Sequence, residues 1–186
     1  MDFDPDLTYT SYFQHRGKAA NARQRDNLEL VIVHARGEVL ADIDMIMPTL
    51  CDDPQYHDFG VFPGVFQDTG PKGRDAVEAN YKEMFANGAY FIESSKDRAV
   101  MSDDSLVTEG TFRQIITADV ARQSGFLSAD TPQSPYYLMT ARQVVFWSFD
   151  EAGKALGEDR FVLHHVIEPL ATDDLPASYP EQFRTA

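Results

Sequence analysis

The sequence predicts an α+β fold in which a curved, mainly antiparallel sheet wraps around three helices. Helical periodicity is confined to the part of the chain before Gly88. The part after Gly88 is rich in Val, Ile, Phe, Tyr and Thr, and turn signals separate its apolar segments. Helices gathered at the front of a chain and long strands at the back are typical of α+β proteins, and 186 residues suit a single domain with a substantial core.

Three helices are expected in the first part of the chain. The first spans residues 18 to 40, where apolar residues recur at helical spacing. These residues are Leu28, Val31, Ile32, Ala35 and Val39. Asp42 is a suitable N-cap for a shorter second helix, which Pro48 should kink or shorten. The third helix is expected over residues 73 to 88, with a glycine at each end.

Four strand segments are expected after the helices. They span residues 90–101, 105–117, 136–149 and 155–167. Residues 119–135 form a long connection between the second and third segments, of a kind that often serves as a lid or a subunit contact. Residues 1–24 should form an N-terminal helical arm, residues 25–168 the body of sheet and helices, and residues 169–186 an irregular tail.

Composition excludes several classes of partner. The chain has 16 Lys and Arg against 30 Asp and Glu, for a formal net charge of -14, so neither nucleic acid nor an anionic membrane surface is an expected partner. The single cysteine, Cys51, excludes an internal disulfide and a cysteine-cluster metal site. Because the first residues lack the basic and apolar runs of a signal peptide, and no apolar stretch approaches a membrane span, we expect a cytoplasmic protein.

The stretch from Asp42 to Gly60 ends in the polar cluster Tyr56-His57-Asp58, where we expect the chemistry. Histidine ordinarily titrates near neutrality, so His57 can donate or accept a proton at working pH. In a strand, His57 and Asp58 face opposite sides, so one should line a cavity while the other supports it or contacts solvent. Tyr56 should share the side of Asp58. A histidine that only bonds a neighbouring loop is an equally good interpretation of His57.

No motif indicates a metal, a nucleotide or a nucleophilic serine. His164 and His165 are adjacent, and adjacent strand residues point to opposite faces, so they are not expected to bind one ion. The chain contains neither a phosphate-binding glycine loop nor the G-x-S-x-G turn of serine hydrolases. Arginines on the expected strands, Arg113, Arg142 and Arg160, could bind a carboxylate or an oxyanion, although such residues more often pair with acids on the outer face.

Three segments resemble the nuclear transport factor 2-like superfamily: DIDMIMPTLCDDPQYHDFG at 42–60, GRDAVEANYKEMF at 73–85 and VVFWSFDEAGKA at 144–155. That superfamily includes SnoaL-like polyketide cyclases, ketosteroid isomerases, limonene epoxide hydrolases and a diarylpropane lyase that releases formaldehyde. The resemblance covers roughly residues 25–168. It implies a cone-shaped α+β barrel, open at one end, whose apolar interior receives a hydrophobic small molecule without a cofactor.

The resemblance also implies site residues. The general-base aspartate of the isomerases falls on Asp58, but their oxyanion-stabilising tyrosine falls on His34 and their second acid on Val145. Because valine offers no donor to an oxyanion, steroid isomerisation is not expected. In dehydratase-like and dehydrochlorinase-like relatives, a pocket histidine after the third helix corresponds to Glu93, which makes Glu93 a candidate base. Strand alternation then places Ser95 and Asp97 on the same face as Glu93, unless a bulge intervenes.

We therefore expect a cofactor-independent acid/base enzyme that acts on a hydrophobic, aromatic small molecule in lyase or cyclase chemistry. His57 is the expected acid/base, Glu93 its partner base, and Tyr56 or Asp58 the orienting group. An isomerase or dehydratase of a cyclic substrate is an alternative, and so is a non-catalytic module that binds a small molecule or a protein. Because superfamily members commonly pair through the outer face of the sheet, the resemblance implies a homo-oligomer, either a dimer or a trimer through residues 119–135.

Overall fold

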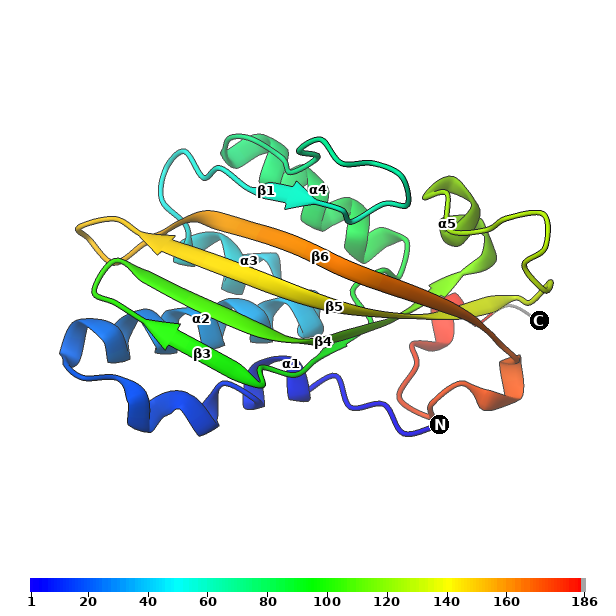
Figure 1. Cartoon of the computed structure of the whole chain (residues 1–186), viewed down its shortest axis with the longest axis horizontal. Coiled ribbons are helices and arrows are strands. Elements are labelled where there is room, and N and C mark those ends of the chain that lie inside the picture. Colours follow the sequence, from blue (N-terminus) through cyan, green and yellow to red (C-terminus); the bar gives the residue numbers. More distant parts are fainter. Residues whose placement is uncertain (185–186) are drawn as a thin grey trace.

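Six strands form one curved sheet, with helices packed against one face, in the computed structural model, which describes residues 1–184 (Figure 1). The strand order is β1-β6-β5-β4-β2, and β3 also pairs with β4. β1 and β6 are parallel, and the other pairs are antiparallel. The predicted α+β class, with a curved and mainly antiparallel sheet around helices, is therefore confirmed.

The main helices are α2 (Ala22–Leu40), α3 (Ile43–Ile46), followed by the 3-10 helix η2 (Met47–Thr49), and α4 (Arg74–Ala86). Asn21 caps α2, since its side chain accepts a hydrogen bond from the amide of Gln24. Asp42 caps α3 in the same way through Met45, as its position predicts. Pro48 follows the end of α3 and lies within η2, so the second helix is as short as expected.

The N-terminal arm contains α1 (Leu7–Thr10) and the 3-10 helix η1 (Phe13–Lys18), and it lies along β2. The hydroxyl of Thr8 accepts a hydrogen bond from the amide of Ser94 at 3.1 Å. Ser11 donates to the carbonyl of Ser94 at 3.2 Å, and the ring of Phe3 stacks on Phe91. These contacts cover a sheet edge whose backbone groups would otherwise stay unpaired.

The strands are β1 (His57–Phe59), β2 (Ile92–Ser94), β3 (Arg98–Met101), β4 (Ser105–Thr117), β5 (Tyr136–Phe149) and β6 (Ala155–Leu170). The segment expected at 90–101 is divided into β2 and β3, because residues 95–97 form a bulge with one residue more than the facing part of β4. Gly110 lies opposite this bulge, and a Cβ there would overlap the carbonyl oxygen of Ser95. The backbone can approach so closely only because Gly110 has no side chain.

A second irregularity lies in the middle of β6. The pairing with β5 shifts between Arg142 and Gln143, which leaves Leu163 as an extra residue on β6. Val162 and His165, on either side of the shift, therefore both reach the helix-covered side of the sheet. Strict alternation along β6 would have separated them.

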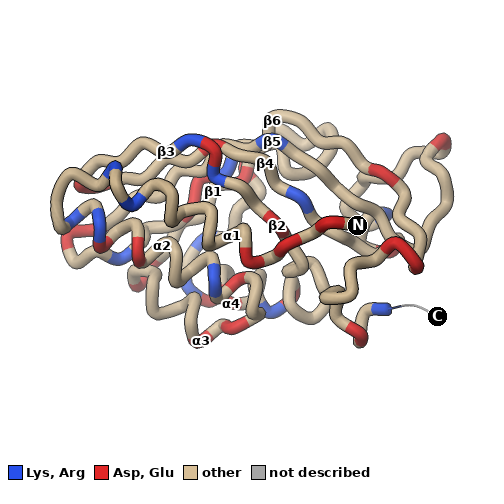
Figure 2. Tube along the Cα trace, turned by 90° about the horizontal axis from the view of Figure 1, so that it is seen from below, with Lys and Arg blue, Asp and Glu red and all other residues tan. Residues whose placement is uncertain are grey.

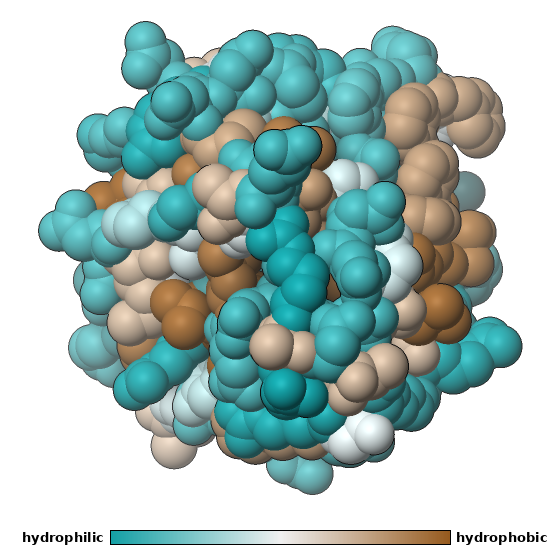
Figure 3. Space-filling view, turned by 90° about the vertical axis from the view of Figure 1, so that its left-hand side faces the viewer, coloured by the Kyte–Doolittle hydropathy of each residue, from teal (hydrophilic) through white to brown (hydrophobic). Residues whose placement is uncertain are grey.

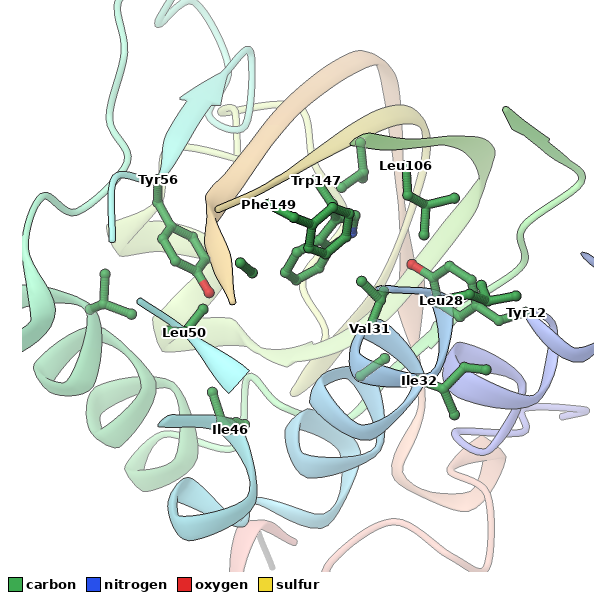
Figure 4. Packing of buried hydrophobic residues seen from close by; sticks show 14 of the residues in the cluster. Tyr12, Leu28, Val31, Ile32, Ile46, Leu50, Tyr56, Leu106, Trp147 and Phe149 are labelled. Atoms are coloured by element: carbon green, nitrogen blue, oxygen red, sulfur yellow. The ribbon is translucent and has the colours of Figure 1, made fainter. Parts of the chain in front are cut away.

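The largest core cluster lies between α2, α3 and the strand ends (Figure 4). Trp147 and Phe149 project from β5 toward Val31 of α2 and Ile46 of α3, and all four side chains are buried. Each such side chain contributes about 1.5–3 kcal/mol through burial. A second cluster, around Tyr179, fixes the tail against the sheet.

The tail and the long connection are more ordered than the sequence suggests. The tail contains the 3-10 helices η3 (Thr172–Asp174) and η4 (Glu181–Phe183), and Tyr179 between them is buried. The connection between β4 and β5 begins with α5 (Ala118–Gln123), which Thr117 caps.

Charges of both signs are interspersed along the trace rather than gathered into one basic face (Figure 2). Among residues 1–184, no helix is both long and apolar enough to cross a bilayer. Apolar side chains also remain exposed on the outer face of the sheet, where Leu163 is 64% and Val166 45% accessible. Figure 3 shows apolar residues along its right edge. This edge corresponds to the front of Figure 1, where the sheet faces the viewer.

Candidate active site

A cavity of about 390 Å³ lies between the sheet and the helices α2 and α4. Its volume is typical of sites for small organic molecules. Much of its wall is apolar, with Ile92 and Phe112 on one side and Met139, Val145 and Trp147 of β5 on the other. The three β5 residues are an even number of positions apart, so strand alternation directs them all inward.

Four charged side chains from three parts of the chain meet in this wall. Glu38 comes from the buried face of α2, Lys96 from the bulge between β2 and β3, and Glu158 and Arg160 from β6. Electrostatic interactions couple all four groups. Two acids and two bases thus share a cavity whose walls are partly apolar, and their mutual attraction offsets part of the cost of burial.

Lys96 is the most deeply buried of the four, with 6% of its surface accessible. Its Nζ donates a hydrogen bond to Ser94 Oγ at 2.6 Å and lies 5.1 Å from the ring centre of Tyr12. Burial lowers the pKa of the Lys96 amine to about 8, although Glu38 and Glu158 oppose that shift. About a tenth of Lys96 is therefore uncharged at pH 7.

The two carboxyl groups are shifted in the opposite direction. Burial, followed by repulsion from Glu38, raises the pKa of Glu158 to about 8, and Arg160 opposes the shift. Burial likewise raises the pKa of Glu38, while a hydrogen bond from Tyr81 lowers it. Since two nearby carboxylates in an apolar site cannot easily both ionise, the pair holds a proton near neutral pH.

Arg160 is held in place by Asp58. Its Nε donates a hydrogen bond to Asp58 Oδ1 at 2.9 Å, and the two residues are register partners on β6 and β1. Burial alone would lower the pKa of Arg160, but Asp58 and then Glu158 raise it above its ordinary value. Arg160 is therefore a permanent positive charge in the wall, placed for an anionic oxygen.

Glu38 ends a buried chain of hydrogen bonds. Tyr81 donates to Glu38 Oε1 at 3.0 Å, and His34 Nε2 lies 2.8 Å from the Tyr81 hydroxyl. His34 Nδ1 lies 2.7 Å from Thr49 Oγ1, whose own proton goes to the carbonyl of Ile46. Nδ1 must therefore carry the imidazole proton, and Nε2 is an acceptor, which the Tyr56 hydroxyl at 3.4 Å can satisfy while the Tyr81 proton goes to Glu38. Burial lowers the pKa of His34 to about 3, so the ring is neutral.

Members of the predicted polar cluster separate to two sides of β1. The hydroxyl of Tyr56 is buried in the same chain, 3.3 Å from that of Tyr81. Asp58 accepts a hydrogen bond from Arg160, and Arg160 lines the cavity. His57 turns outward, where its Nδ1 lies 2.7 Å from Asp68 Oδ2, and it does not line the cavity.

Glu93 lies beneath the N-terminal arm rather than in the cavity. Its Oε1 accepts a hydrogen bond from Arg113 Nη1 at 2.6 Å, and its Oε2 accepts one from the amide of Asp4 at 2.6 Å. Its neighbours Ile92 and Ser94 line the cavity instead. Because β1 and β2 are opposite edges of the sheet, the structure does not bring His57 and Glu93 together. Their catalytic roles stay predictions.

Three residues of this site were not among those expected from the sequence: Glu38, Lys96 and Glu158. The alternation of side chains between the two faces of a strand offered a sequence signal for two of them, Lys96 and Glu158. Lys96 is three residues from Glu93, so alternation places it on the opposite face, and Glu158 stands two residues before Arg160, so these two share one face of β6.

Comparison by sequence gives no relatives, since no family model and no curated protein matches the chain. Comparison by structure gives many. Rv0760c from Mycobacterium tuberculosis superposes with a TM-score of 0.57 over 78% of this chain and 98% of that chain, at 15% identity. The nuclear transport factor 2-like fold is shared. Another structure of Rv0760c, in complex with estradiol-17beta-hemisuccinate, covers 73% of this chain and 92% of that chain with a TM-score of 0.52 at 15% identity.

Two further structures with the nuclear transport factor 2-like fold bear the names of enzymes. A protein described as a SnoaL-like polyketide cyclase from Jannaschia sp. CCS1 has a TM-score of 0.56 and 12% identity, over 76% of this chain and 88% of that chain. SalBIII, an epoxide hydrolase/cyclase-like enzyme of pyran ring formation in salinomycin, has a TM-score of 0.52 and 12% identity, over 74% of this chain and 90% of that chain. At such identities the likeness concerns the nuclear transport factor 2-like fold alone.

Proposed function

We propose that this protein is a cofactor-independent acid/base enzyme of the lyase or cyclase type, acting on a hydrophobic, aromatic small molecule that carries a carbonyl group. The observation that supports this proposal best is the pair of coupled carboxyl groups, Glu38 and Glu158, in one apolar cavity. A pair that shares a proton supplies an acid and a base at the same pH.

Each carboxyl group has a distinct role. The Tyr81 hydroxyl donates to Glu38 and so favours its ionised form, which makes Glu38 the base. Glu158 has no hydrogen bond of this kind among the described residues, and its pKa is raised to about 8, which makes it the acid. Arg160, oriented by Asp58, stabilises negative charge that develops on the substrate carbonyl oxygen.

Aldol-type chemistry uses these roles directly. In the cleaving direction, Glu38 takes the proton of a β-hydroxyl group, the carbon–carbon bond breaks, and its electron pair moves toward the carbonyl oxygen near Arg160. Glu158 then protonates the resulting enolate. In the cyclising direction, the same groups act in reverse on a ketone and an enolisable carbon of one molecule.

The cavity also supports the substrate class. Its apolar walls suit aromatic rings, and the Oε1 atom of Gln143 is buried without a hydrogen-bond partner among residues 1–184. A phenol or hydroxyl group of the substrate would satisfy this acceptor. The complex of Rv0760c, a protein of this fold, with estradiol-17beta-hemisuccinate supports a hydrophobic ligand.

Substitution of the carboxyl pair tests the proposal. We expect Glu38→Gln and Glu158→Gln each to lower kcat by roughly a hundredfold or more on a panel of aromatic β-hydroxy ketones, measured by aldehyde release. Glu168→Gln, at an exposed position on the same strand as Glu158, is the matched control and should retain full turnover. Wild-type turnover in both folded cavity variants would overturn the assignment.

The product separates the alternatives. An isomerase or dehydratase of a cyclic substrate would use the same carboxyl pair to move one proton or to expel water, and would release no aldehyde. Binding of panel compounds without turnover, detected as a thermal shift of the wild-type protein, would instead indicate a non-catalytic binding module.

A further inference from the structure

We infer that Lys96 is a covalent nucleophile whose ε-amine forms an imine with an aldehyde or ketone carbon of the substrate. The inference rests on the proposed function, because it requires a carbonyl substrate. It assigns to Lys96 a role that the carboxyl pair cannot fill, since a carboxylate forms no stable imine with a carbonyl group.

The surroundings of Lys96 differ from those of a structural lysine. Buried lysines normally pair with an acid, yet among the described residues no carboxylate lies within ion-pairing distance of Lys96 Nζ. The amine instead makes one hydrogen bond, to Ser94 Oγ at 2.6 Å, beside the ring of Tyr12. Lys72 and Lys82, by contrast, pair with Asp68 and Glu78 in solvent.

The amine is also available in its reactive form. Burial lowers the pKa of Lys96 to about 8 from an ordinary 10.5. At pH 7, a group with a pKa of about 8 has roughly three hundredfold more free amine than a lysine with the ordinary value of 10.5. Nucleophilic addition requires this unprotonated form, so Lys96 is favoured over the lysines that solvent surrounds.

Acid and base groups for imine formation face the same cavity. The Nζ lone pair adds to the carbonyl carbon, and the carbonyl electron pair moves to oxygen, which takes a proton from Glu158. The added nitrogen then loses a proton to the Glu158 carboxylate. When Glu158 returns this proton to the new hydroxyl group, water leaves, and the nitrogen lone pair completes the C=N bond. The product is a protonated imine once the nitrogen has taken up the positive charge.

An iminium ion is a stronger electron sink than the carbonyl group it replaces. When Glu38 removes the proton of a β-hydroxyl group, the carbon–carbon bond breaks to give an aldehyde, and its electron pair forms an enamine on Lys96. Glu38 then gives this proton to the enamine carbon, and addition of water, whose surplus proton goes to Glu158, releases the ketone and the free amine. No oxidant, reductant or cofactor is needed, because every electron pair stays within the substrate and Lys96.

Reductive trapping tests the inference without knowledge of the natural substrate. The wild-type protein is incubated with 4-hydroxybenzaldehyde and sodium borohydride at pH 7, and modified peptides are identified by mass spectrometry. We expect one 4-hydroxybenzyl group, located on Lys96, at aldehyde concentrations that leave Lys72 and Lys82 unmodified. Modification of the exposed lysines with none on Lys96 would overturn the inference.

Two variants distinguish a covalent role of Lys96 from a role that needs only its positive charge. Lys96→Arg keeps the positive charge but has no nucleophilic amine, so it should lose both trapping and turnover. Lys82→Arg is the control and should retain both, since Lys82 is exposed on α4. Circular dichroism checks that the Lys96→Arg protein is folded. Full turnover by the folded variant would contradict an imine step.

Failure of the imine and failure of the carboxyl pair give different results. If Glu38→Gln and Glu158→Gln lose turnover while wild-type Lys96 is never trapped, the acid/base proposal stands and the imine is wrong. If Lys96 is trapped while both carboxyl variants keep full turnover, the imine stands and the carboxyl assignment is wrong.

Discussion

Arg160 Nε donates a hydrogen bond to Asp58 Oδ1 at 2.9 Å, across the parallel pair of strands β6 and β1. Asp58 is the position on which the general base of ketosteroid isomerases falls. Here its carboxylate is engaged by a guanidinium group, so in this chain Asp58 orients a positive charge in the cavity wall. We therefore assign it a positioning role for Arg160.

Loss of this ion pair should cost stability and ligand affinity together. For Asp58→Asn we expect a loss of about 1–3 kcal/mol in the free energy of unfolding, because the buried Arg160 charge loses its partner. Denaturant titration measures that loss. The double variant with Arg160→Gln should recover part of it, and simple additivity of the two single losses would contradict coupling between the residues.

The Glu158 carboxyl should make stability depend on pH. Its pKa of about 8 in the folded protein lies above the ordinary 4.5, so between these values the folded state binds more protons than the unfolded state. Its contribution to stability is therefore fully present below pH 4.5 and is lost as pH rises toward 8. Glu158→Gln removes this titration and should gain about 1–3 kcal/mol relative to wild type at pH 8.

Thermal unfolding at several pH values checks this expectation. The difference in Tm between Glu158→Gln and wild type should grow from pH 4.5 to pH 8. Glu168→Gln should show no such trend because its side chain is in solvent. A Tm difference that stays constant over this range would mean that Glu158 does not titrate as the structure indicates.

Turnover should pass through a maximum near pH 8. Below that value Lys96 is protonated, and above it Glu158 is ionised, because burial brings the pKa of each group to about 8. Glu38, Asp97 and Arg160 interact electrostatically with Lys96 or Glu158. The acidic and basic limbs of the pH profile therefore report apparent pKa values of the whole cluster. The dependence of kcat/KM on pH measures them, and a flat profile around pH 8 would contradict these roles.

Two sets of acid/base residues now make opposite predictions. The assignment from sequence predicts that His57→Ala and Glu93→Gln abolish turnover. The cavity predicts near wild-type kcat/KM for His57→Ala, because that ring lies outside the cavity. Glu93→Gln should instead lose about 1–3 kcal/mol of stability, since Glu93 holds Arg113 and the arm. Loss of turnover in folded His57→Ala would restore the first assignment.

Self-association is a separate expectation, and the outer face of the sheet supports it. Leu163 is 64% exposed there, next to other apolar side chains. We expect light scattering to give at least a dimer mass for wild type and a smaller mass for Leu163→Asp. Leu40→Asp, at a position on α2 that is 53% exposed, is the control. A wild-type monomer would remove the expectation of a homo-oligomer.

Local signals predicted the fold well. Asp42 and Pro48 mark the start and end of the second helix, because capping and the missing proline amide act within one turn of the chain. The long strands β4, β5 and β6 also agree with the expected segments, since their β-branched and aromatic residues are typical of strands. Such features depend on neighbours in sequence.

The site was harder to predict because it depends on which face of each strand is turned inward. The resemblance to dehydratase-like and dehydrochlorinase-like proteins placed the candidate base on Glu93, and a shift of one residue exchanges it for Ser94 at the cavity wall. Glu38 and Glu158 are far apart in sequence, and no local pattern shows that α2 and β6 line the same cavity. Their shared proton arises only from the folded arrangement.

Gly110 carries no functional group, yet it decides where the reactive amine of this protein lies. The carbonyl of Ser95 occupies the space that a side chain at 110 would need, so Gly110→Ala should displace the bulge, and Lys96 with it. A design that places this lysine in another protein of the same fold therefore also needs a glycine on the neighbouring strand, opposite the bulge.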